Sequence, residues 1–205
     1  MRQRIALIAL VLGQLLAPLP VRAGDELPGK PDPLKVIRER LRGQWLRPEQ
    51  YRVRITGKVT VIDGNTLRFE DGTRVITSGG IDAPDLQQQG LLDGKLYPCD
   101  KDAADFLEKL IGGRPVSFYA YAEGSDRDTS KRIRGVCFVG ETNLGAEMVR
   151  NGWALSHHSG MTPYEILARE NKRGLWRGQF ILPELWRKGQ RLPGEPPETK
   201  AGAQR

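Results

Sequence analysis

Residues 51–77 read YRVRITGKVTVIDGNTLRFEDGTRVIT. Apolar and polar residues alternate from Tyr51 to Ile62, which predicts a strand because successive side chains of a strand point to opposite faces. Two shorter strands are expected at 66–70 and 73–77, joined by Asp71-Gly72, a pair typical of hairpin turns. The stretch therefore predicts three strands at the start of the folded domain.

The residues that follow alternate between helical and strand patterns. We expect a helix over 98–111, strands over 116–122 and 135–139, and helices over 143–150 and 162–172. Three strands, a helix, two strands and two helices is the order of a partly open barrel of the oligonucleotide-binding (OB) type. The fold class is therefore predicted as α+β, a five-stranded OB-fold-like β-barrel with about three helices.

The first 23 residues have the pattern of a secretory signal peptide. Arg2 and Arg4 precede an apolar run, Pro18 follows it, and Val21-Arg22-Ala23 provides a cleavage site. The run is shorter than the ~20 apolar residues that span a bilayer, which disfavours the alternative of an uncleaved anchor. We expect a secreted or periplasmic protein with no stable membrane anchor after cleavage.

Export changes the meaning of the net charge. The 205-residue chain carries a formal charge of +7, and residues 1–23 hold three arginines and no acidic residue. Cleavage therefore lowers the charge by three, to +4. Clustered positive charge attracts a phosphate backbone, but this modest value identifies no partner by itself.

The remaining segments flank the domain. Residues 24–50 are predicted to form a linker and a short helix, 51–187 the folded domain, and 188–205 a disordered tail with three prolines and little apolar content. We expect the protein to be a monomer.

Cys99 and Cys137 are the two cysteines of the chain. They are too few for a structural zinc site, and an even pair in an exported chain favours a disulfide. A catalytic thiol is the alternative, although neither cysteine has the neighbours in sequence that a thiolate nucleophile needs. The sequence therefore predicts a Cys99–Cys137 disulfide.

Several separate motifs resemble the staphylococcal nuclease-like (thermonuclease) family in order and spacing. They are 61–67 (VIDGNTL), 80–85 (GIDAPD), 134–136 (RGV), and, as in exported bacterial members, 174–176 (GLW) and 183–187 (PELWR). The resemblance covers roughly residues 54–187, and the same fold is expected from it. It implies calcium-dependent hydrolysis of DNA and RNA phosphodiesters, with single-stranded nucleic acid or a nucleotide as the ligand.

The resemblance also implies site residues, one by one. Asp63 and Asn65 match the first metal-binding turn, Asp82 matches the second metal aspartate, and Ala83 matches the residue whose carbonyl oxygen binds the metal. Asp85 matches the glutamate that orients water. The two phosphate-clamping arginines are represented by Arg134 alone.

Four departures from the family pattern weaken the same chemical step. Asn65 replaces a metal aspartate, so a calcium site would be weakened. Asp85 is one methylene shorter than glutamate, and the first arginine falls on Thr77, or on Ile76 if one glycine is inserted. Arg132-Ile133 replaces the usual Tyr-Gly before the second arginine. His157 and His158 are expected at or near the surface without a catalytic role.

These observations predict an exported nuclease-like protein with a cleft that faces a phosphodiester or a nucleotide, and with weak or lost hydrolysis. An active calcium-dependent secreted nuclease and a non-catalytic envelope interaction protein are the alternatives.

Overall fold

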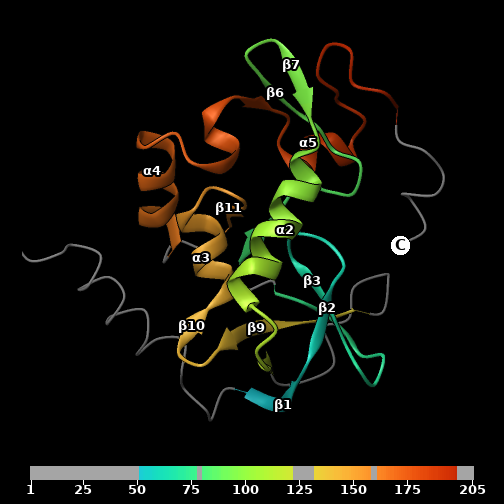
Figure 1. Cartoon of the computed structure of the whole chain (residues 1–205), viewed down its shortest axis with the longest axis vertical. Coiled ribbons are helices and arrows are strands. Elements are labelled where there is room, and N and C mark those ends of the chain that lie inside the picture. The colour runs from blue at the N-terminus through green and yellow to red at the C-terminus, as the bar shows by residue number, and fades with distance from the viewer. Residues whose placement is uncertain (1–50, 78–79, 122–131, 158–160, 198–205) are drawn as a thin grey trace, which may run out of the picture. The chain divides into compact units, whose positions relative to one another are not determined.

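The strand expected over 51–62 is divided into β1 (Tyr51–Gly57) and β2 (Val59–Val61) in the computed structural model (Figure 1). The structure describes residues 51–77, 80–121, 132–157 and 161–197. The predicted signal peptide and the segment 24–50 lie outside these residues.

The main sheet has the strand order β1-β8-β9-β4-β3-β2, and β10 (Thr142–Asn143) pairs with β9. Its other strands are β3 (Thr66–Phe69), β4 (Arg74–Ile76), β8 (Val116–Tyr121) and β9 (Ile133–Val139). All pairs are antiparallel except β4 with β9.

The break at Lys58 explains how this sheet curls. β1 pairs with β8 and β2 pairs with β3, so the two halves of one run of chain are the end strands of the same sheet. Because only one residue separates these halves, the sheet must bend back on itself. The expected α+β, OB-like fold is confirmed, and within the described residues β1 and β2 do not pair to close a barrel.

Helices accompany the curled sheet, and the first two of them pack directly against it. They are α2 (Cys99–Ile111), α3 (Leu144–Arg150), α4 (Thr162–Glu170) and α5 (Pro183–Arg187), with a 3₁₀ turn η3 (Gly174–Arg177). α3 packs against α2, α4 and β9, and lies beside α2 in Figure 1. The three predicted helices are confirmed within two residues at each end, whereas α5 was not expected.

The core lies between the sheet and these helices. Most of the predicted strands and helices, although not the strand over 51–62, contribute buried apolar side chains, including Leu67, Val75, Leu107, Phe118, Val136 and Met148. On α2 the buried residues recur every four positions up to Ile111, and Gly112 then ends the helix in the left-handed conformation with φ 59°. Periodic burial of this kind is why these elements were predictable.

Two smaller sheets were not predicted. β5 (Ile81–Asp82) pairs with β11 (Leu155–Ser156), while β6 (Gly90–Leu92) pairs with both β7 (Lys95–Tyr97) and β12 (Gln179–Phe180). Strands of two or three residues are too short to show an alternating pattern.

The segment expected as a disordered tail is ordered up to residue 197 and packs onto the domain through Leu192 and Glu195. Glu195 is buried and its carboxylate accepts hydrogen bonds from Trp186 Nε1 at 2.7 Å, Leu192 N at 2.9 Å and Gln89 N at 3.0 Å. Arg191 stacks on the Trp186 ring at 3.9 Å. This segment therefore covers α5, and residues 198–205 lie outside the described part of the chain.

The predicted disulfide is absent, because Cys99 and Cys137 are both free and buried. Cys99 lies in the first turn of α2, where its thiol donates to Gln88 O at 3.3 Å, and Cys137 lies in the middle of β9 opposite Phe118. The two thiols are thus enclosed by different parts of the fold. Burial raises the pKa of both, which also excludes an activated thiolate.

None of the described helices has the length and apolar character needed to cross a membrane.

Candidate phosphate-facing site

Two acidic turns meet at one side of the curled sheet. The first, Asp63-Gly64-Asn65, joins β2 to β3, and Asn65 N donates to Asp63 Oδ1 at 2.9 Å. The second follows β5 and runs from Asp82 to Asp85. A Cβ on Gly64 would lie only 2.8 Å from Ala83 Cβ, so the turns approach each other as closely as they do because residue 64 lacks a side chain.

The turns open onto a pocket of about 380 Å³. All of the metal and catalytic residues implied by the resemblance line it: Asp63, Asn65, Asp82, Ala83, Asp85 and Arg134. The pocket also includes residues that the sequence did not implicate, among them Arg187 and His157. Three aspartates and three arginines line it in total, so its formal charges balance without His157.

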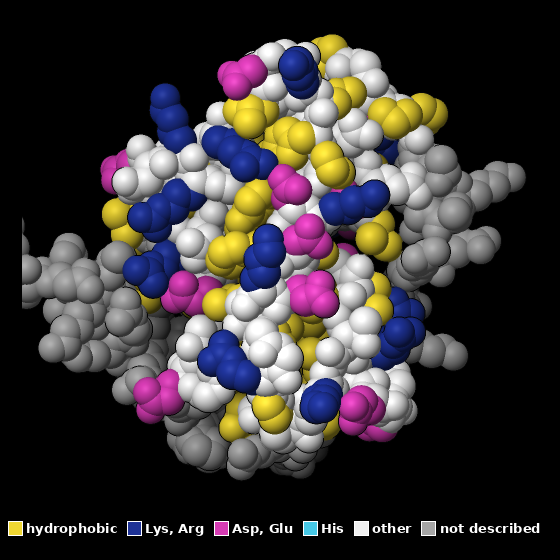
Figure 2. Space-filling model, viewed as in Figure 1, with side chains coloured by type: hydrophobic (Ala, Val, Ile, Leu, Met, Phe, Trp, Pro, Cys, Tyr) yellow, Lys and Arg dark blue, Asp and Glu magenta, His cyan; other side chains and the backbone are white. Residues whose placement is uncertain are grey.

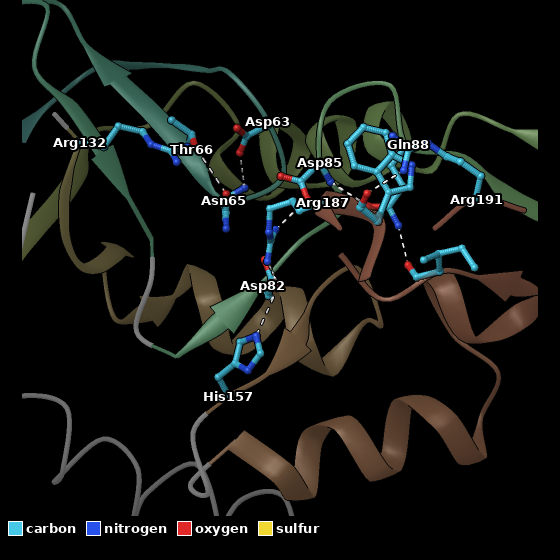
Figure 3. A network of polar contacts seen from close by, with 12 residues as sticks. Asp63, Asn65, Thr66, Asp82, Asp85, Gln88, Arg132, His157, Arg187 and Arg191 are labelled. Atoms are coloured by element: carbon cyan, nitrogen blue, oxygen red, sulfur yellow. Dashed lines mark hydrogen bonds and ion pairs between the residues drawn. The ribbon is translucent and has the colours of Figure 1, made fainter. Parts of the chain in front are cut away.

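Arg187 is the residue that sequence reasoning missed most clearly. It extends from the last turn of α5 and reaches both carboxylates of the second acidic turn (Figure 3). Its Nη2 donates to Asp82 Oδ2 at 2.7 Å, and its Nη1 donates to Asp82 Oδ1 at 3.2 Å and to Asp85 Oδ2 at 2.7 Å. Nothing in the local sequence indicated this contact, because Arg187 and Asp82 are 105 residues apart.

His157 also contacts Asp82. Its Nε2 lies 3.4 Å from Asp82 Oδ2, and it is brought there by the pairing of β11 with β5, in which Leu155 lies opposite Asp82. His157 N donates to Gly80 O at 2.6 Å, which extends this pairing. His157 is at the surface as expected, since its side chain is 58% accessible. It also lines the pocket, which was not expected. His158 lies outside the described residues.

The structure distinguishes the two positions that replace the first arginine. Thr77 is buried, and both its backbone N–H and its hydroxyl donate to Asn65 O, at 2.7 and 3.3 Å. Ile76 instead lines the pocket and lies opposite Arg134 in the β4–β9 pairing. Thr77 therefore supports the first acidic turn, while the side chain at 76 is the one that faces the site.

Two arginines border the pocket, Arg132 just before β9 and Arg134 within it. Arg132 Nη1 donates to Thr66 Oγ1 at 3.0 Å, and Arg134, two residues further along the chain, has an exposed side chain. Both side chains line the same pocket. Together they offer fixed positive charge to an anion that enters the pocket.

The second acidic turn is held in place by Gln88, whose side chain is fully buried. Gln88 Oε1 accepts from Asp85 N at 3.0 Å, and Gln88 Nε2 donates to Ile181 O at 2.6 Å, just before α5. One side chain thus ties the loop that carries Asp85 to the segment that carries Arg187.

Burial dominates the protonation of Asp85. It raises the pKa of this carboxyl to about 6, although the Arg187 guanidinium opposes the rise. Asp82 and Asp63 contribute to the increase through their negative charge. The pKa of Asp85 therefore lies about two units above the ordinary value for an aspartate.

This arrangement does not fit a calcium ion. Calcium takes six to eight oxygen ligands, yet both carboxylate oxygens of Asp82 and one of Asp85 accept hydrogen bonds from Arg187. Within the described ranges there is no group of three or more His, Cys, Asp or Glu residues that could hold a metal ion.

Comparison with known proteins identifies the class. A family model described as "Staphylococcal nuclease homologue" matches residues 76–178. The chain is 31% identical over 118 residues to the "Probable staphylococcal-like nuclease CAN3" of Oryza sativa subsp. japonica, and 24% identical over 119 residues to the "Probable endonuclease LCL3" of Clavispora lusitaniae.

These alignments cover 55% and 53% of this chain, but only 28% and 50% of the two relatives. The chain thus spans half or less of the length of the curated proteins that it matches. The family match covers half of the chain and includes the second acidic turn, Arg132 and Arg134. The chain belongs to the staphylococcal nuclease-like family, whose members are generally calcium-dependent.

Proposed function

We propose that this protein is an exported nuclease-like protein whose pocket faces a nucleic-acid phosphodiester or a nucleotide, and whose hydrolytic activity is weak or lost. The observation that carries the proposal is the pocket itself, which brings Asp63, Asp82, Asp85 and Arg134 together while Arg187 occupies the two carboxylates of the second turn. The residues that match the family's site lie together, but Asp82 and Asp85 are paired with Arg187 and are not free to bind a metal ion or activate water.

The weak hydrolysis follows from the loss of positive charge at the reacting phosphate. Ile76 lies beside Arg134 where a second guanidinium would complete a clamp. Removal of one transition-state donor typically costs about 10²–10³ in rate, and an arginine on a transferring phosphoryl group contributes about 10³–10⁵. Arg187 does not compensate for this loss, because its guanidinium already donates to Asp82 and Asp85.

Ligand contact is expected at the pocket rather than over a broad surface. In Figure 2 basic and acidic side chains are interspersed across the face that is drawn. Arg132 and Arg134, by contrast, are concentrated at the rim of one pocket. The expected ligand is single-stranded nucleic acid or a nucleotide, as the family resemblance implies.

Export is part of the proposal and is tested separately. Residues 1–23 have the signal-peptide pattern, so the chain is expected in the periplasm or the medium, shortened at its N-terminus. Cell fractionation with mass measurement of the N-terminus checks this, and recovery of the full-length chain from the cytosol would contradict it.

The hydrolysis is tested with the purified protein, single-stranded DNA and millimolar calcium. We expect salt-sensitive binding and turnover at least about 10²-fold below that of a staphylococcal nuclease control, as the missing donor requires. Chelator-sensitive turnover at the level of the control would disprove the proposal. Lack of any salt-sensitive binding would instead favour an envelope interaction protein.

A slow calcium-dependent nuclease is the second candidate, favoured by the convergence of all the implied site residues on one pocket. It requires Arg187 to release Asp82 and Asp85. It predicts that Asp82→Ala abolishes the residual turnover, whereas equal turnover in the variant would identify a contaminating nuclease.

A further inference from the structure

Arg187 makes a more complete set of contacts than an ordinary surface ion pair. Its guanidinium forms two hydrogen bonds with Asp82, at 2.7 and 3.2 Å, and a third with Asp85 at 2.7 Å. The Asp82 side chain is only 12% accessible. A planar guanidinium that binds one carboxylate with two hydrogen bonds and bridges to a second is a strong, geometrically specific cation site.

The fold holds this guanidinium in place. Trp186, the preceding residue, is buried, and its indole donates to the buried Glu195. Gln88 connects the loop of Asp85 to Ile181 at the start of the same segment. Both partners of the ion pair are thus anchored to buried side chains, so the contact costs little additional ordering of the chain.

The same oxygens cannot serve a divalent ion at the same time. Besides Arg187, His157 lies against Asp82 Oδ2, and Asp63 Oδ1 accepts from Asn65 N. A dication placed between Asp82 and Asp85 would also be repelled by a guanidinium only a few ångströms away, where the local dielectric is below that of water.

We propose that Arg187 is a resident cation that takes the place of a divalent metal at Asp82 and Asp85, so that this pocket excludes calcium. The proposal goes beyond the function proposed above, because it states which cation neutralises the two carboxylates and requires no nucleic acid. It assigns to the C-terminal helix α5 a direct role in the chemistry of a site otherwise built by the sheet.

The test is calcium titration by calorimetry of the wild-type protein and of Arg187→Met, which keeps an unbranched side chain but removes the charge. The wild type is expected to show no saturable binding up to about 10 mM, above the weakest Kd range of about 10⁻³ M for calcium modules. Arg187→Met is expected to bind calcium with a Kd near or below about 10⁻³ M. Asp82→Asn in the Arg187→Met background should abolish that binding.

The matched control is Arg177→Met. Arg177 also pairs with an aspartate, Asp102 at 2.8 Å, and is 38% accessible against 45% for Arg187, but it does not line the pocket. This variant should bind no calcium. Acquired binding in Arg177→Met would show that a general change in charge is responsible and would overturn the proposal.

Two further results would overturn it. One is saturable calcium binding by the wild type that Asp82→Asn removes, a measurement that needs no Arg187 variant to fold. The other is a folded Arg187→Met protein, verified by circular dichroism, that gains no binding. Because no nucleic acid is used, either failure is distinct from failure of the proposed function, which depends on DNA binding and turnover.

Discussion

At the scale of single residues, Ile76 and Thr77 are adjacent and both buried, but only one of them lines the pocket. Thr77 is turned toward Asn65 O, whereas Ile76 lines the pocket beside Arg134. An arginine introduced at position 76 should therefore contact a bound phosphate, whereas one introduced at position 77 should not.

We predict that Ile76→Arg tightens binding of a single-stranded oligonucleotide by about tenfold, since one charge-assisted hydrogen bond contributes roughly 1.5 kcal/mol. Thr77→Arg should give no gain and should lower the free energy of unfolding by about 1–3 kcal/mol, because it removes the hydrogen bond to Asn65 O and buries a charge. Fluorescence anisotropy and urea unfolding measure the two effects. Equal gains at both positions would contradict this assignment.

Asp85 provides a pH-dependent prediction at the same scale. Its pKa in the folded protein is raised to about 6, above the ordinary 3.8, so the native state binds a proton more tightly than the unfolded state. The free energy of unfolding should therefore fall as pH rises from about 4 to about 6. With the side chain 30% accessible, we expect a loss of about 1–2 kcal/mol rather than the full value of the shift.

Asp85→Asn should remove this pH dependence, as measured by urea unfolding at several pH values. The control is Asp105→Asn, an exposed residue of α2 outside the pocket, which should leave the pH profile unchanged. An identical profile in wild type and Asp85→Asn would show that Asp85 does not have the raised pKa.

At the scale of elements, the position of α5 depends on the segment that follows it. Three donors, one of them Trp186 Nε1, converge on the buried Glu195 carboxylate. α5 has only five residues, too few to be stable without tertiary contacts. The segment 188–197 therefore fixes the helix that presents Arg187.

Glu195→Gln should lower the free energy of unfolding by about 1–3 kcal/mol, because an amide replaces one acceptor oxygen with a donor and leaves a buried N–H without a partner. Glu184→Gln is the control, since Glu184 lies on α5 itself but is exposed and pairs only with Lys188 in the described structure. Urea unfolding compares the two. An equal loss in both variants would mean that burial of Glu195 has no special importance.

At the scale of the whole molecule, the two thiols report on global unfolding. Cys99 is buried against Gln88 and Cys137 is buried within the main sheet, and burial raises the pKa of both. Neither can react without a large opening of the fold.

We expect no reaction with a thiol reagent in the native state at neutral pH and two thiols per chain in denaturant without reductant. Two thiols would confirm the free cysteines seen in the structure. A count of zero in denaturant would show that the exported protein forms the disulfide after all, and rapid reaction in the native state would contradict the burial.

The main elements of the fold could be predicted because burial follows their own periodicity. The helix over 98–111 and the strands around 66–77 show this directly, since the same residues that form the pattern form the core. The strand over 51–62 was only half correct. Its division at Lys58 depends on which strands lie beside each half, and local sequence does not encode that choice.

The sequence alone determined the order of the main strands and helices, the family, and the three acidic residues and one of the three arginines that line the pocket. It did so because those residues lie in short motifs within single turns and strands. Tertiary structure decided that Arg187 binds Asp82 and Asp85, that Ile76 rather than Thr77 faces the site, and that the two cysteines remain apart. Each of these depends on contacts between segments distant in the chain, and only the packing of the whole domain determines which distant groups meet.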